Sequence, residues 1–164
     1  MSNDASVTRQ LIQTLEDGKD GFASGAEALE KDGEAALAAT FREFGAKRAT
    51  FSDELQKIAA GYGDHIEESG SVAAKIHRGW MAVKDAVSGS DPDGVLDAAE
   101  QGEDHSVSVF EKALQSDISP EFKVVIQRQM GEICSAHDRV RALRDDRALA
   151  SVASPDPDPR KSQP

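Results

Sequence analysis

The chain has 164 residues, a length that fits one domain with a substantial hydrophobic core. Charged residues make up 30% of it and give a net charge of −11, which argues against a nucleic-acid backbone or an anionic membrane surface as a partner. No run approaches the ~18 apolar residues of a transmembrane helix, and the single cysteine, Cys134, excludes an intramolecular disulfide and favours a reducing, cytoplasmic location.

Two long helices are predicted in the first part of the chain, because apolar residues recur there at spacings of three, four or seven. The first should run from about Asp4 to Lys31 and the second from about Glu34 to Ala60, with a helix stop and turn at Asp32-Gly33 between them. The apolar stripe of the second helix contains one charged residue, Arg48. An arginine on an inward stripe indicates a polar layer inside the fold.

Three more helices are predicted before the composition of the chain becomes rich in proline and aspartate. A shorter helix should span residues 69–88, and two long helices should begin at Asp91-Pro92 and Ser119-Pro120, each a capping residue followed by proline. Beyond about Ala150 the prolines and aspartates exclude helix. We therefore predict one folded domain over residues 1–150 and a disordered tail over residues 151–164.

The helix lengths and loops predict an all-α four-helix bundle. Short loops make the first and second long helices antiparallel, and likewise the last two. The segment over residues 61–90 is long enough to carry the chain back along the bundle, which makes the second helix parallel to the helix that follows this segment. Such a helical crossover between the second and fourth helices is the connection of a ferritin-like four-helix bundle.

Several segments support this assignment by resemblance. They are Lys47-Arg48 with Phe51 and Glu54-Leu55, Gly70-Ser71, His77-Arg78-Gly79-Trp80, Glu100-Gln101-Gly102-Glu103-Asp104 and His137-Asp138-Arg139-Val140-Arg141. Together, over roughly Val7 to Leu143, they resemble a family of small, mostly proteobacterial four-helix-bundle proteins, classed as a domain of unknown function and grouped with ferritin-like proteins. The resemblance implies a fold and no activity, because ferritin-like architecture does not by itself imply iron chemistry.

A diiron centre needs a glutamate from each of two helices and a Glu-x-x-His pair from each of the other two. This pattern is absent from the two predicted helices that contain Glu54 and Glu132. Glu54 is followed three residues later by Lys57, and Glu132 is followed three residues later by Ser135. His137 comes five residues after Glu132, which places the two on different faces of a helix. We therefore expect no cofactor, with iron or another divalent metal as the alternative.

Arg48 provides a different expectation for the middle of the bundle. Counting residues along the helices places Asp17 and Glu103 near its level, and sets Glu103 opposite Gln129 and Glu132. A guanidinium has five donors and can neutralise buried carboxylates. We predict a core polar network of these five residues, in which Arg48 pairs chiefly with Glu103. The alternative is that Arg48 extends from the edge of the stripe to solvent.

Metal remains the alternative for an acidic cluster near this layer. Glu100, Glu103 and Asp104 share one helical face at spacings of three and four, and Glu132 and His137 could complete a site. The competing interpretation is a cluster of caps and salt bridges without an ion.

His77 and Trp80 share a face of the predicted crossover helix, where they would pack it onto the bundle or contact a small ligand. No catalytic residue is predicted. The functional expectation is a non-enzymatic bundle with a structural, stress-related or interaction role, able to self-associate through a helix face. The alternatives are an iron-binding ferritin-like protein or oxidase with an irregular carboxylate and histidine site, and a small-molecule binder using a cavity beside Trp80.

Overall fold

The computed structural model describes residues 4–61 and 91–153, with side chains up to residue 150. The described chain forms four α-helices, α1 (Asp4–Lys31), α2 (Ala35–Gly61), α4 (Pro92–Gln115) and α5 (Pro120–Ala153). The all-α prediction and the four-helix bundle are confirmed. The predicted crossover helix, with its residues His77 and Trp80, and the end of the predicted tail lie outside the described residues.

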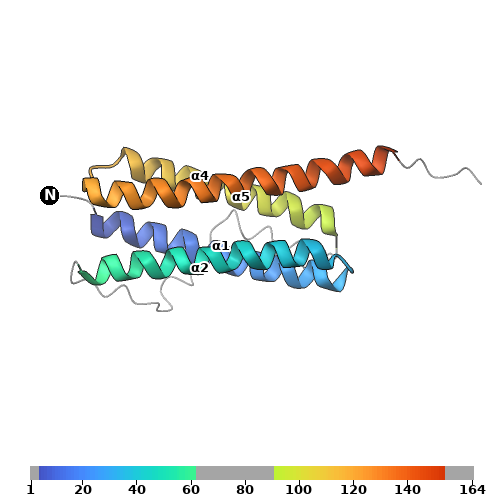
Figure 1. Ribbon diagram of the computed structural model, residues 1–164, viewed down its shortest axis with the longest axis horizontal. Helices are drawn as coiled ribbons and strands as arrows, with labels where there is room; N and C mark the ends of the chain where they lie inside the picture. The colour runs from blue at the N-terminus through green and yellow to red at the C-terminus, as the bar shows by residue number, and fades with distance from the viewer. Residues whose placement is uncertain (1–3, 62–90, 154–164) are drawn as a thin grey trace, which may run out of the picture.

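The helix directions follow from the loops. α1 and α2 are antiparallel, as are α4 and α5, and α2 and α4 run in the same direction, as the sequence predicts (Figure 1). The close helix pairs are α1 with α2, α4 with α5, and α1 with α4. α2 and α4 are therefore diagonal neighbours, and a contact between them crosses the centre of the bundle.

The turn between α1 and α2 has a local cause in the sequence. Gly33 has a φ of 80°, a conformation that glycine adopts without the steric cost of a Cβ. The Gly33 amide donates to the Glu30 carbonyl (3.1 Å) and the Glu34 amide to the Leu29 carbonyl (2.8 Å). These two hydrogen bonds form the Schellman motif, which ends α1 and reverses the chain.

A buried aspartate joins the first turn of α1 to the start of α5. The Asp4 carboxylate, only 3% exposed, accepts hydrogen bonds from the Ser119 backbone amide (2.9 Å) and from its hydroxyl (2.7 Å). The Ser119 carbonyl in turn accepts from the Lys123 amide in the first turn of α5. Asp4 thus orients the α4–α5 loop against α1, a role that its place at the beginning of a predicted helix does not reveal.

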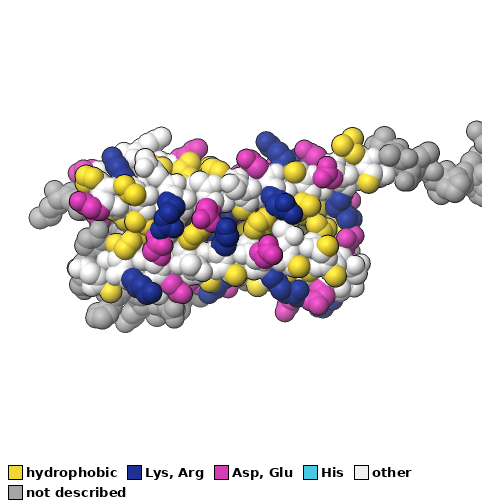
Figure 2. All heavy atoms as spheres, in the orientation of Figure 1, with side chains coloured by type: hydrophobic (Ala, Val, Ile, Leu, Met, Phe, Trp, Pro, Cys, Tyr) yellow, Lys and Arg dark blue, Asp and Glu magenta, His cyan; other side chains and the backbone are white. Residues whose placement is uncertain are grey.

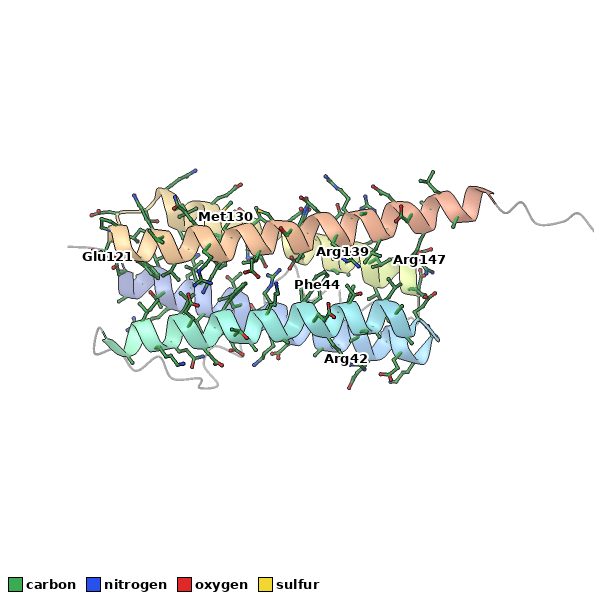
Figure 3. The ribbon with its side chains drawn as sticks, in the orientation of Figure 1. Arg42, Phe44, Glu121, Met130, Arg139 and Arg147 are labelled. Atoms are coloured by element: carbon green, nitrogen blue, oxygen red, sulfur yellow. The ribbon has the colours of Figure 1, made fainter. Side chains whose placement is uncertain are left out.

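Long side chains close the seam between α2 and α5. Its ion pairs are Lys47–Glu132 (2.8 Å) and Glu54–Arg128, and at its end Arg147 of α5 pairs with Glu34, the residue just before α2 (2.9 Å). Phe44 and Arg147 extend into this seam from the two helices (Figure 3). On the face that Figure 2 shows, basic and acidic side chains alternate with hydrophobic ones. None of the described helices combines the length and apolar character needed to cross a bilayer.

The core consists of two hydrophobic clusters with a polar layer between them. One cluster is built around Phe22, Leu29, Phe41, Leu96 and Val140. The other contains Leu11, Leu15, Phe51, Leu55, Phe110, Phe122, Ile126 and Ile133. On α2, Arg48 comes between Phe41 of the first cluster and Phe51 of the second, so a charged side chain separates the two apolar regions.

Candidate functional site

The centre of the bundle contains a buried ion pair between diagonal helices. Arg48 of α2 is 1% exposed and Glu103 of α4 is 0% exposed. Arg48 Nη2 donates to Glu103 Oε2. The guanidinium carbon lies 5.6 Å from the centre of the Phe22 ring, close enough for a cation–π contact. A Cβ placed on Gly18 would lie 3.7 Å from Arg48 Cγ and Nη1, which is an ordinary van der Waals distance, so the arginine packs against α1 at this glycine.

The polar groups of this layer are only partly satisfied by the described residues. Arg48 Nη1 and Glu103 Oε1 are buried and have no hydrogen-bond partner there. Gln129 is 0% exposed, and its Nε2 donates to the Phe51 carbonyl (3.4 Å), whereas its Oε1 has no partner. Burial raises the pKa of Glu103 above its ordinary value, although Arg48 acts in the opposite direction. The pair is therefore strongly desolvated, and each charge depends on the other.

Glu132 does not belong to this layer, which corrects the sequence prediction. Its side chain is 40% exposed and accepts from Lys47 Nζ in the seam between α2 and α5. The sequence prediction gave the correct level of Glu132 along α5 but the wrong face of the helix, because the adjacent Ile133 is the residue that points into the core. One residue turns the side chain direction by about 100° around the helix. Asp17 accepts from Gln13 Nε2 (2.8 Å), and its place in the network stays a prediction.

A second polar cluster lies between α4 and α5. Glu100 and Asp104, one turn apart on α4, meet His137 of α5, and one ligand atom from each lies within 4.8 Å of the others. His137 Nε2 is hydrogen-bonded to Asp104, and its Nδ1 lies 3.4 Å from an Asp138 carboxylate oxygen. The structure thus brings together three of the five metal candidates and places Glu132 elsewhere.

Two arginines that the sequence reasoning missed complete this cluster. Arg141 Nε donates to Glu100 Oε1 (3.1 Å), and Arg144 Nη1 donates to Glu100 Oε2. Residues 137, 141 and 144 follow one another at spacings of four and three, so they share one face of α5. This spacing was the available signal that the arginines lie beside His137.

The residues at mid-bundle do not fit a diiron centre. The layer contains a guanidinium, a carboxylate and an amide, and a fixed cation would repel two divalent ions. Neither of the helices α2 and α5 supplies the Glu-x-x-His pair. The half-buried Cys134 is no activated thiolate, because burial and nearby carboxylates raise its pKa.

The fold and this layer define a class of protein, an all-α bundle whose centre is occupied by a buried ion pair. Residues 5–116 match the family model described as a domain of unknown function, DUF2383, and the chain belongs to this family. The matched region ends just after α4, so α5 with His137 and the two arginines lies beyond it. No curated protein matches the chain.

Proposed function

We propose that this protein is a non-enzymatic, ferritin-like four-helix bundle with a structural, stress-related or interaction role. The observation that carries the proposal is the buried Arg48–Glu103 ion pair at mid-bundle. In this layer a ferritin-like diiron protein places its metal ligands. An organic cation here supplies the positive charge that a metal would supply, without open coordination positions or redox chemistry.

The burial of Arg48 supports this interpretation over a surface role for the arginine. A guanidinium that is 1% exposed and flanked by Phe22 and Gly18 cannot exchange its carboxylate partner for water. A net charge of −11 weighs against nucleic acid and anionic membranes as partners. We expect a cytoplasmic protein that can associate with a second copy of itself through a helix face.

The cluster of Glu100, Asp104 and His137 favours a second candidate function, the binding of a divalent metal ion at the side of the bundle. A histidine nitrogen with two carboxylates is a common ligand set for zinc, iron and manganese. This candidate is compatible with the first, because the cluster lies between α4 and α5 and leaves the Arg48–Glu103 pair in place. Unlike a diiron oxidase, such a site would bind a single ion.

Anaerobic loading with ferrous iron tests the first proposal. Tag-free protein is stripped with chelator, loaded, freed of excess iron by gel filtration and analysed for iron per chain. After admission of air we expect no more than one ion per chain and no oxo-bridged diferric absorption. Two ions per chain, lost in Glu103→Ala, would overturn the proposal. Light scattering of the same sample measures self-association.

A further inference from the structure

The cluster between α4 and α5 has the composition and the dimensions of a small metal site. An ion bound to nitrogen and oxygen at about 2.0–2.2 Å holds its ligand atoms no more than about 4.4 Å apart. The ligand atoms of Glu100, Asp104 and His137, within 4.8 Å of one another, need only small side-chain rotations to reach that spacing. Two helices supply them, which fixes their relative positions before an ion arrives.

A third carboxyl group, next to the cluster, gives a separate indication. Glu103 lies on α4 between the two carboxylate ligands, and it interacts electrostatically with both His137 and Asp104. Its Oε1 is buried and has no hydrogen-bond partner in the described structure. This oxygen is a further buried acceptor next to the cluster that no described donor fills, although Arg48 balances the charge of the carboxylate through Oε2.

Two arginines of α5 contact one of the proposed ligands, Glu100. Both oxygens of Glu100 accept from guanidinium groups, one from Arg141 and one from Arg144. These two side chains bring two positive charges to a site whose proposed carboxylate ligands carry two negative charges. A divalent ion bonded to one Glu100 oxygen would take the place of the guanidinium on that oxygen, so the ion and one arginine compete for Glu100.

Arg144 is free to leave Glu100. Its side chain is 37% exposed, and the guanidinium already lies 3.4 Å from an Asp145 oxygen and 3.8 Å from an Asp97 oxygen. Moving from Glu100 to these exposed carboxylates therefore costs little in charge pairing. The Glu100 carboxylate, 8% exposed, stays in place while its partner changes.

We propose that Glu100, Asp104 and His137 bind one divalent transition-metal ion and that Arg144 is the competitor that the ion displaces from Glu100. The proposal rests on the second candidate function and adds to it the regulation of the site. The ligand is a single ion of borderline character, such as zinc, held by three protein atoms with water in the remaining positions. The site binds the ion, and no reaction is assigned to it.

The test measures zinc binding to the tag-free full chain by titration calorimetry, with metal analysis after gel filtration. We expect one ion per chain. His137→Ala should weaken binding by more than about tenfold, since even a lost outer-shell partner commonly costs that much. Arg144→Gln should strengthen binding several-fold, because the competing cation is gone. Glu132→Gln, on the same helix but paired with Lys47, is the matched control and should bind as the wild type does.

Absence of zinc binding, or binding unchanged by His137→Ala, would overturn the metal site while leaving the proposal for Arg48 untouched. Binding that is equal or weaker in Arg144→Gln would overturn the competition. Circular dichroism of each variant checks that its helices are intact. The two proposals can be told apart by their tests. The proposal for the Arg48–Glu103 pair is contradicted only if the iron-loading experiment finds two ions per chain that depend on Glu103.

Discussion

Removing the cation from the centre of the bundle should be among the most damaging single changes to this protein. In Arg48→Met, the Glu103 carboxylate stays 0% exposed and loses the donor that contacts its Oε2. Breaking a buried ion pair by removing one partner costs about 3–5 kcal/mol, because the remaining charge is left desolvated. In a chain of this size, each kcal/mol lowers the melting temperature by about 2–4 °C, so we expect a fall on the order of 10 °C.

The free energy of unfolding is measured by urea titration followed by far-ultraviolet circular dichroism. The double variant Arg48→Met with Glu103→Leu should recover most of the loss, because it replaces both charges by apolar groups of similar volume. Lys47→Met is the matched control from the adjacent position of α2. Its partner Glu132 is 40% exposed, so this change should cost no more than about 1 kcal/mol.

Two results would refute the reasoning. A loss in Arg48→Met no larger than that of Lys47→Met would mean that Glu103 is not held in a dry environment. A double variant as unstable as the single variant would mean that the layer contributes through packing of the arginine stem and not through charge pairing.

Three further predictions concern the frame around this layer. Gly25→Ala should lower the free energy of unfolding in urea by about 1–3 kcal/mol, because the added Cβ would lie 2.9 Å from the buried ring of Phe41. Gly131→Ala is the matched control: its Cβ would have nothing within 4 Å, so this change should raise the free energy of unfolding by about 0.5–1 kcal/mol. Asp4→Ala should cost about 1–3 kcal/mol and speed amide exchange at Ser119, whose amide then loses its buried acceptor. Burial raises the pKa of Glu16, but hydrogen bonds to its carboxylate hold it below the usual 4.5. Its stabilising effect is therefore present above that pH and lost as the pH falls through the folded-state pKa, so unfolding titrations should show a smaller acid loss for Glu16→Gln than for the wild type.

The helices could be predicted from the sequence because their signals are local. Apolar spacing and the turn at Asp32-Gly33 placed α1 at the residues the structure gives and α2 within a residue of its bounds. The Asp91-Pro92 pair located the start of α4, where the Asp91 carboxylate accepts from the Asp93 amide. Each of these features is decided within one or two turns of helix, so a single sequence contains the information.

The site could be predicted only in part, because it depends on rotation and on contacts between helices. The inward stripe placed Arg48 correctly, since its neighbours on the stripe are large and apolar. Glu132 failed because counting residues fixes the level along a helix axis and leaves the facing direction uncertain by one position. Arg141 and Arg144 were missed because their partner Glu100 belongs to another helix. No local pattern in the sequence of α5 predicts that contact.

The division of the core into two apolar clusters has a consequence for how the helices align. If α2 slid by one turn along α4, Arg48 would enter a cluster of leucines and phenylalanines while Glu103 would lose its cation. Two helices with uniformly hydrophobic inner faces would tolerate such a shift at a lower cost in free energy. The ion pair therefore selects one register for the diagonal helices, and uniqueness of the native arrangement is what this polar layer contributes.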